Sequence, residues 1–208
     1  MAANFDNSAW FYDKLAFVVF RKALINAQLY LLSFIPANSS ILVAGGGTGW
    51  ILEEIAKIHP SGLTITYVEV STKMMARSKK RNAGNNTLLF ITNAIEDVTI
   101  KNTFDIVITP FLLDNFTEQT LQKVLNHIHL SLKPGGIWLN SSFQVSGKWW
   151  HKALLKSMYL FFKIFCNIEA SKLPDIEKQY KHHRYKAIAN QTFFSDFIIA
   201  EIYKKTLK

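Results

Sequence analysis

The stretch ILVAGGGTGWILEEIAKI, residues 41–58, runs from a hydrophobic segment through four glycines into a helical pattern. Residues 40–44 predict a buried strand, and residues 50–58 predict a helix whose isoleucines share one face. A glycine-rich loop between such a strand and helix lets backbone atoms approach a nucleotide-like ligand at the helix N-terminus. This stretch therefore predicts an α/β fold with a cofactor site at the loop.

The spacing of these glycines argues against a dinucleotide. The dinucleotide fingerprint G-x-G-x-x-G, started at Gly45, places Trp50 where the third glycine has to let the helix pack closely on the strand. The pattern that fits is G-x-G-x-G, on Gly45, Gly47 and Gly49. Such a loop suits a ligand without a pyrophosphate, and the helix N-terminus favours a carboxylate like the one on S-adenosylmethionine (SAM). A glycine-rich turn with no ligand is the alternative interpretation.

Polar side chains stand at the ends of the next two predicted strands. Glu69 follows the loop by about two dozen residues, where folds of this kind place an acid that accepts both ribose hydroxyls. Asn93 ends the third strand, and its amide is suited to the adenine edge, with Ala94 and Ile95 adding backbone and an apolar wall. The alternatives are a solvent-facing acid and an ordinary turn asparagine.

Strands and helices alternate along the chain, which predicts a parallel sheet covered on both faces. Further strands are expected at residues 63–70, 87–93, 104–110 and 137–143. Helices are expected at 8–34 (two), at 72–82 with Ser71 as N-cap, and before KPGG with Leu121, Val124, Leu125, Ile128 and Leu132 on one face. Residues 185–205 predict a closing hairpin, and the absence of repeats or a linker predicts one domain.

In this order, the motifs ILVAGGGTG, YVEVSTKMMARSKKR, FITNAIEDV, FDIVITPFLLDNF and LSLKPGG resemble those of the class I SAM-dependent methyltransferases. The resemblance implies a Rossmann-like three-layer sandwich with SAM across the carboxyl ends of the strands. Its sheet would have seven strands, mostly parallel with an antiparallel last strand, and extra N-terminal helices. Ala44, at the end of the first strand, and Asn93, after the third, stand where the family usually has acids. Ala44 removes a partner of the SAM ammonium group, which would need backbone carbonyls instead.

The resemblance implies that the cofactor contacts the glycine loop and the ends of the second, third and fourth strands. The expected cofactor-binding residues are Gly45, Gly46, Gly47, Thr48, Gly49, Glu69, Val70, Ser71, Met74, Asn93, Ala94, Ile95, Thr109, Pro110 and Phe111. The product would be S-adenosylhomocysteine. The single domain, 1–208, would comprise an N-terminal helical lid (1–36), the SAM-binding core (37–143), and a lid helix with the closing hairpin (144–208).

The acceptor is expected to be a small, fairly apolar molecule. In-line methyl transfer depends mostly on positioning and on exclusion of water, and needs no covalent nucleophile. Residues 109–116, expected beside the methyl group, are mostly apolar and lack the Asp/Asn-Pro-Pro-aromatic motif of methylases that act on nucleic-acid bases. Tyr12 and Asp114 are the polar candidates on the acceptor side, and no other catalytic residue is assigned.

Residues 148–165 predict a helix with four lysines within an arc of roughly 80° and apolar side chains elsewhere. Such a helix is expected to bury most of its circumference. It would do so by packing on the sheet and the N-terminal helices, as a lid over substrate, or against a membrane or partner. The histidines are interpreted as structural at 127 and 129, and as part of a solvated basic run at 181–186.

Three other functions remain open from the sequence. The net charge of +9 is compatible with an RNA methyltransferase, although no basic groove interleaved with aromatic residues is visible, and nucleic acid is not the expected partner. GGGTG followed by VEV also resembles the aminopropyltransferases related to spermidine synthase, but acids after the fourth strand are scarce. A non-catalytic SAM-binding protein is the third alternative, because Ala44 and Asn93 depart from the family pattern.

Composition sets the remaining expectations. The 208 residues are 49% hydrophobic, enough for one packed α/β domain. The single cysteine, Cys166, permits no internal disulfide and indicates a reducing compartment, which we take to be the cytoplasm. No signal peptide, transmembrane run or Cys/His metal spacing is recognised. The oligomeric state is left open.

Overall fold

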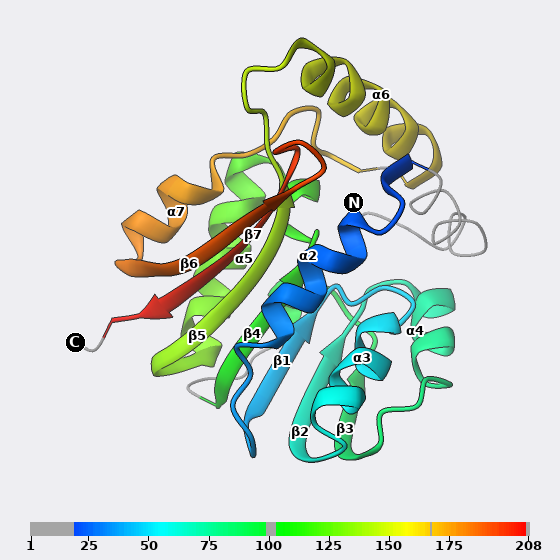
Figure 1. The fold of residues 1–208 in the computed structure, drawn as a ribbon, viewed down its shortest axis with the longest axis vertical. Coiled ribbons are helices and arrows are strands. Elements are labelled where there is room, and N and C mark those ends of the chain that lie inside the picture. The colour runs from blue at the N-terminus through cyan, green and yellow to red at the C-terminus, as the bar shows by residue number, and fades with distance from the viewer. Residues whose placement is uncertain (1–18, 99–102, 167, 207–208) are drawn as a thin grey trace.

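The computed structural model describes residues 19–98, 103–166 and 168–206. Seven strands form one sheet in the order β3-β2-β1-β4-β5-β7-β6, with helices on both faces (Figure 1). Strands β1 to β5 are parallel, whereas β7 is antiparallel to both β5 and β6. The expected three-layer α/β architecture with an antiparallel last strand is therefore confirmed.

The described elements have the following bounds. The strands are β1 (Ser40–Ala44), β2 (Ser61–Val68), β3 (Asn85–Ile91), β4 (Phe104–Pro110), β5 (Leu132–Phe143), β6 (Tyr185–Phe193) and β7 (Ile198–Lys205). The α-helices are α2 (Ala23–Leu32), α3 (Trp50–Ile58), α4 (Thr72–Ser78), α5 (Glu118–Ser131), α6 (Trp149–Cys166) and α7 (Ile176–His182). Two 3-10 turns are η1 (Ile95–Asp97) and η2 (Leu113–Asn115).

Two hydrophobic clusters hold the layers together. On one face of the sheet, the buried side chains of α2 and α3 pack on β1 and β7, with Leu31, Ile55 and Ile202 fully buried. On the other face, α5 and α7 pack on β4 and β5 around Leu125 and Trp138. Burying apolar area on both sides of the sheet is the main favourable contribution to this fold.

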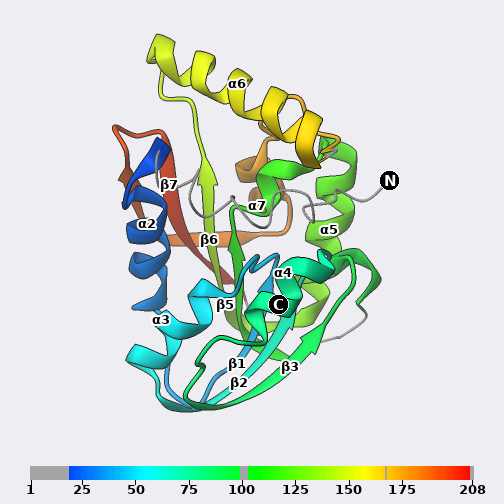
Figure 2. The same ribbon diagram turned by 90° about the vertical axis from the view of Figure 1, so that its right-hand side faces the viewer.

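The parallel strands direct their carboxyl ends to one edge of the sheet, and this edge positions the site. β1 lies between β2 and β4, with Val43 opposite Tyr67 and Ile108. The loops that follow these strands therefore meet at one place, as expected at the switch point of an open parallel sheet. Helix α6 lies beyond the same edge (Figures 1 and 2).

Several predicted boundaries differ from the structure. β2 ends at Val68, so Glu69 and Val70 lie in the loop after it, and β5 starts at Leu132 because the sheet continues through the KPGG segment with a register shift. The short helix α7 was not expected. Its N-cap is Asp175, whose side chain accepts a hydrogen bond from the Lys178 N–H at 3.0 Å.

The solvated basic run expected at residues 181–186 is partly wrong. The ring of His183 stacks on that of His129 with centroids 4.7 Å apart. Tyr185 is buried, and its hydroxyl pairs with His129 Nδ1 at 3.1 Å. Only part of this segment therefore faces solvent. The first of the two helices expected at residues 8–34 lies mostly outside the described residues. Tyr12 lies outside them altogether.

The prediction that the helix at 148–165 buries most of its circumference is also wrong. Only His151, Tyr159 and Cys166 of α6 are buried. Trp149, Leu160 and Ile164 remain largely exposed to solvent. A period of 3.6 residues shows which side chains share a face, and here one partly apolar face has no cover among the described residues.

Candidate functional site

A cavity of about 700 Å³ opens at the carboxyl edge of the sheet. The loops after β1, β2, β3 and β4 all contribute to its lining, and so does one side of α2. Trp50, at the start of α3, lines it as well. The volume falls in the range of about 300–1,000 Å³ that small-molecule sites occupy.

The glycine loop is fixed from both sides by the end of β2. Glu69 Oε2 accepts a hydrogen bond from the Gly47 N–H at 2.9 Å, and the Tyr67 hydroxyl donates to the Gly47 carbonyl at 3.0 Å. Glu69 Oε1 also accepts from the Ser71 N–H at 2.9 Å, and the whole residue is buried. The loop conformation is therefore held by protein groups before any ligand arrives.

Gly49 lets α3 start close to α4. It is the N-cap of α3 with φ of 78°, in the left-handed region where glycine has no steric cost. A Cβ at this position would lie 2.5 Å from Ser78 Cβ and 2.6 Å from Ser78 Cα. The glycine thus serves the packing of two helices and is not itself part of the cavity lining.

Arg81 holds the outer side of the same loop. Its Nε–H donates to the Thr48 carbonyl at 3.1 Å, and its guanidinium is 3.3 Å from a carboxylate oxygen of Glu53. The segment after α4, the loop and α3 are joined through one side chain. This connection was not expected from the sequence, which gives no periodic signal for it.

Most of the predicted site residues lie around the large cavity. Its lining includes Gly45, Gly46, Gly47, Thr48, Glu69, Val70, Met74, Asn93, Ala94, Ile95, Pro110 and Phe111. Gly49, Ser71 and Thr109 are outside it. Ser71 caps α4 as expected, because its Oγ accepts from the Met74 N–H at 3.1 Å.

Thr109 faces away from the cavity. It is fully buried, its hydroxyl donates to Asn140 Oδ1 at 2.9 Å, and it accepts from the Trp138 indole N–H at 2.9 Å. Neighbouring residues of a strand point to opposite faces of the sheet, so Pro110 reaches the cavity and Thr109 does not. The expected cofactor contact of Thr109 is therefore not part of the lining.

The structure adds residues that sequence reasoning missed. Arg21, Leu24, Ile25 and Gln28 line the cavity from α2 and the residues before it. Other additions are Trp50, Glu96, Asp97, Leu112, Asn115, Phe116, Thr120, Lys123 and Glu169. Asp97 belongs to the NAIEDV motif directly after the third strand, so its place in the cavity lining could have been predicted from the sequence. The contribution of α2 depends on tertiary packing and has no local signal.

Asp114, a predicted acceptor-side group, does not line the large cavity. It lines a separate cavity of about 30 Å³ together with Phe111, Phe143 and the inner side of α6. Its Oδ2 accepts from the Phe143 N–H at 3.0 Å, and its carbonyl accepts from the Tyr159 hydroxyl at 3.0 Å. Asp114 thus joins η2 to β5 and α6, and the acceptor-side role expected for it lacks a contact with the large cavity.

Burial raises the pKa of the Asp114 carboxyl to about 8, with Glu201 adding to the rise and the Phe143 N–H opposing it. The folded protein then binds more protons than the unfolded chain between the ordinary pKa of about 3.9 and pH 8, so stability falls as pH rises through this window. We expect Asp114→Asn to flatten the dependence of the free energy of unfolding on pH between 5 and 8, as measured by urea titration.

The control for that measurement is Asp105→Asn. The pKa of Asp105 is lowered: burial alone would raise it, but the Lys133 ammonium at 2.8 Å and the Ser40 N–H outweigh that effect. Its titration falls below pH 5, so this variant should keep the wild-type slope. An Asp114→Asn protein with the wild-type slope would contradict the assigned pKa.

The sequence model of a family described as "Methyltransferase domain" matches residues 41–136. Malonyl-[acyl-carrier protein] O-methyltransferase of Priestia megaterium is 30% identical over 142 residues, covering 67% of this chain and 50% of that protein. The ubiquinone/menaquinone biosynthesis C-methyltransferase UbiE of Wigglesworthia glossinidia brevipalpis is 32% identical over 148 residues, covering 68% of this chain and 55% of that protein. The chain spans about half the length of these curated relatives.

The fold is shared with solved structures. The 1,6-didemethyltoxoflavin-N1-methyltransferase of Burkholderia thailandensis, solved with 1,6-didemethyltoxoflavin and S-adenosylhomocysteine, superposes with a TM-score of 0.67. The match covers 96% of this chain and 85% of that chain at 14% identity. At this identity the likeness shows a common fold and no more.

Proposed function

Since the chain belongs to the class I SAM-dependent methyltransferase family, we propose that it transfers the methyl group of SAM to a small, fairly apolar acceptor. The observation that supports this proposal is the cavity of about 700 Å³ at the carboxyl edge of the sheet. The glycine loop, Glu69, the segment 93–97 and the segment 110–112 all line it. Cofactor-side and acceptor-side groups therefore adjoin one space.

Glu69 is the proposed ribose ligand. Its carboxylate lines the cavity and is held in place by the N–H groups of Gly47 and Ser71. A carboxylate is an acceptor only, and its two oxygens match the spacing of a pair of vicinal hydroxyls. This arrangement makes Glu69 both a support of the loop and a ligand.

The adenine ring is proposed to lie beside the loop after β3. Ile95 is buried and would supply an apolar contact, and Asn93 lines the cavity next to it. Asp97 also lines this part, four residues beyond the position where the family usually has an acid. Its carboxylate is the proposed acceptor for the exocyclic amino group, in place of the acid replaced by Asn93.

When bound, SAM supplies a methyl group on a sulfonium sulfur, and in-line transfer to the acceptor leaves S-adenosylhomocysteine. The chain's own contribution is to orient both molecules and to exclude water. Phe111, Leu112 and Phe116 line the cavity after β4, and Leu24 and Ile25 line it from α2. This apolar surface supports an apolar acceptor.

Polar groups at the rim offer some selectivity. Arg21 and Lys123 line the cavity, and Glu169 is held there with a carboxylate oxygen 3.4 Å from the Thr120 hydroxyl. The relatives are named for malonyl-[acyl-carrier protein] and for ubiquinone and menaquinone biosynthesis. Carboxylate-bearing and quinone-like small molecules are accordingly the first acceptors to test.

Titration calorimetry with S-adenosylhomocysteine tests the cofactor assignment. We expect one site per chain, and no binding of ADP, whose pyrophosphate the G-x-G-x-G loop does not suit. A labelled-SAM assay with carboxylate and quinone-like acceptors then tests transfer. Absence of heat at millimolar S-adenosylhomocysteine would refute the proposal, and binding without transfer to any acceptor would favour a non-catalytic SAM-binding protein.

A further inference from the structure

The outer face of α6 carries large apolar side chains in contact with solvent. Trp149 is 81% exposed, Leu160 62% and Ile164 68%. At 100° per residue the three fall within an arc of about 60° along the whole helix. Large apolar residues scattered singly on a surface are ordinary, but three that align along one face of a helix indicate an interaction surface.

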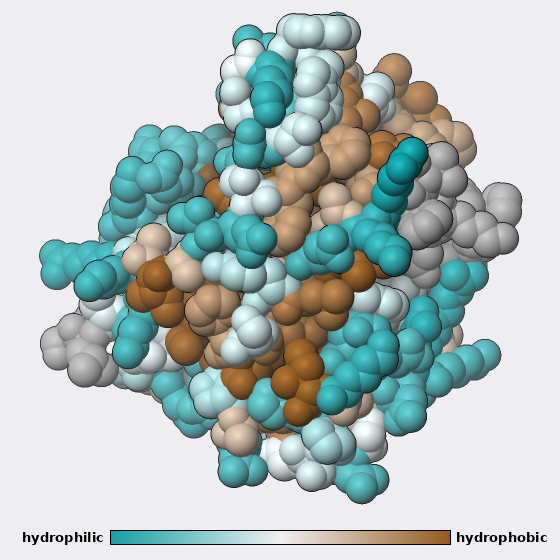
Figure 3. Space-filling view, viewed as in Figure 1, coloured by the Kyte–Doolittle hydropathy of each residue, from teal (hydrophilic) through white to brown (hydrophobic). Residues whose placement is uncertain are grey.

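Three lysines flank this stripe on one side. Lys152, Lys156 and Lys163 are exposed and fall within the adjoining arc of about 40°. The sequence of α6, WWHKALLKSMYLFFKIFC, contains no acidic residue. In Figure 3 the top of the molecule, where Figure 1 places α6, carries hydrophobic and hydrophilic side chains next to one another. The face is therefore both apolar and positively charged.

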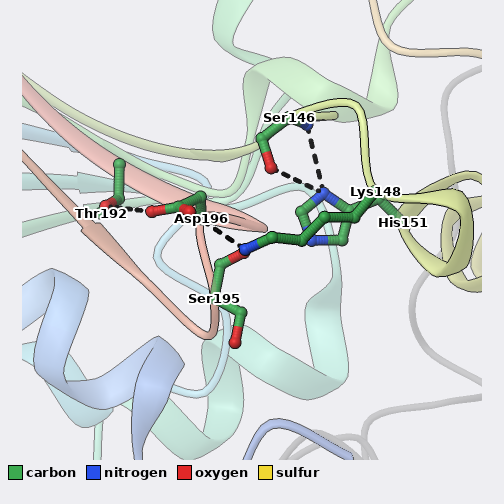
Figure 4. Close-up of polar contacts among 6 residues, drawn as sticks. All are labelled: Ser146, Lys148, His151, Thr192, Ser195 and Asp196. Atoms are coloured by element: carbon green, nitrogen blue, oxygen red, sulfur yellow. Dashed lines mark hydrogen bonds and ion pairs between the residues drawn. The ribbon is translucent and has the colours of Figure 1, made fainter.

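Contacts on the opposite side fix which face of α6 points outward. Lys148 Nζ donates to the Ser195 carbonyl at 2.8 Å and lies 3.1 Å from Asp196 Oδ2, in the β6–β7 turn (Figure 4). The Ser146 N–H donates to Nδ1 of the buried His151 at 3.2 Å (Figure 4). The Tyr159 hydroxyl donates to the Asp114 carbonyl. The exposed stripe is consequently a fixed feature of the folded chain.

The shape and chemistry of this face fit a lipid surface. A single convex helix at the end of the molecule offers no groove for a peptide, and its polar groups are flexible lysines that match anionic headgroups without fixed geometry. Among the described residues, no helix is long and apolar enough to cross a bilayer. We propose that the outer face of α6, defined by Trp149, Lys152, Lys156, Leu160, Lys163 and Ile164, binds the surface of an anionic lipid bilayer with the helix parallel to it.

Co-sedimentation with vesicles tests the charge component. The full chain should bind phosphatidylglycerol-rich vesicles, bind pure phosphatidylcholine vesicles far less, and lose affinity as salt rises. Replacing Lys152, Lys156 and Lys163 by Gln should weaken binding at least tenfold, since each lysine near an anionic surface contributes about a factor of five. The control replaces the exposed Lys172, Lys178 and Lys186, which removes the same charge elsewhere.

A second pair of variants tests the apolar component. Leu160→Ser with Ile164→Ser should weaken vesicle binding at least tenfold, since each buried CH₂ is worth about 0.8 kcal/mol. The matched control is Leu130→Ser with Ile188→Ser, because these residues are 51% and 44% exposed on α5 and β6. Circular dichroism and urea titration confirm that all variants remain folded.

The outcomes separate the possible occupants of the face. Loss of binding only in the two α6 variants supports the proposal. Equal losses in the α6 and control variants, or no vesicle binding by the wild type, would overturn it. A wild-type dimer that Leu160→Ser with Ile164→Ser converts to a monomer, without vesicle binding, would assign the face to a second copy of the chain. Vesicle binding is measured without a cofactor, so a negative result would count against the membrane proposal and not against methyl transfer.

Discussion

Glu69→Ala is expected to lower the affinity for S-adenosylhomocysteine at least tenfold. The carboxylate is the proposed ligand of the ribose hydroxyls, and a charge-assisted hydrogen bond lost in a buried site costs about 1.5–3 kcal/mol. Each 1.4 kcal/mol is a factor of ten in the dissociation constant. The same substitution also removes the acceptor of the Gly47 N–H, so a loss of loop order adds to the loss of contact. Titration calorimetry measures the combined loss of affinity.

Tyr67→Phe separates these two contributions. It removes the hydroxyl that donates to the Gly47 carbonyl and leaves the carboxylate of Glu69 in place. A loss of affinity caused by a looser loop should therefore appear in both variants. The further loss caused by the missing ribose contact should appear only in Glu69→Ala. If Glu69→Ala stays folded and binds S-adenosylhomocysteine as wild type does, the ribose assignment is wrong. Equal losses in the two variants would reduce Glu69 to a support of the loop.

Gly49→Ala is expected to lower the free energy of unfolding by about 2–5 kcal/mol. A left-handed conformation costs an L-residue about 1–2 kcal/mol, and an added methyl group in a packed interior costs about 1–3 kcal/mol. The new Cβ would be 2.6 Å from a backbone atom, Ser78 Cα, which a side-chain rotation cannot relieve. Urea titration with a comparison of the m-values measures the loss.

Gly147→Ala is the matched control for this prediction. Gly147 has φ of 81°, close to the 78° of Gly49, but a Cβ there would meet no atom within 4 Å among the described residues. Gly147→Ala should therefore lose only the part of the free energy of unfolding that comes from the left-handed conformation. Equal destabilisation by the two substitutions would mean that α3 and α4 move apart at little cost, contrary to the tight contact described here.

The sequence predicts those parts of the fold that a short local pattern determines by itself. The bounds of β1, α3 and β4 match the prediction, because each combines an apolar run with a break on both sides. The glycine loop was recognised from the identity of its residues. The closing hairpin followed from two apolar runs in succession near the C-terminus.

The remaining differences between prediction and structure concern tertiary packing. Thr109 belonged to the right strand end, but its orientation depends on the strand alternation and on Trp138 and Asn140, which lie far away in sequence. Asp114 follows β4 as expected, yet its burial is set by α6. For α6 itself, the apolar pattern predicted burial, whereas the structure leaves one side exposed. The orientation and burial of these side chains depend on tertiary packing, which overrides the local sequence pattern.

Helix α6 is attached to the rest of the protein at two places. Near its first end, Lys148 is bonded to the β6–β7 turn. In its second half, the Tyr159 hydroxyl donates to the Asp114 carbonyl, and the buried Cys166 packs beside Tyr159. A helix held in this way has no free half to swing about a hinge, so movement over the nearby cavities requires local unfolding of one attachment. Cys166 is fully buried, so the rate at which its thiol reacts with a thiol reagent reports how often this part of the helix opens.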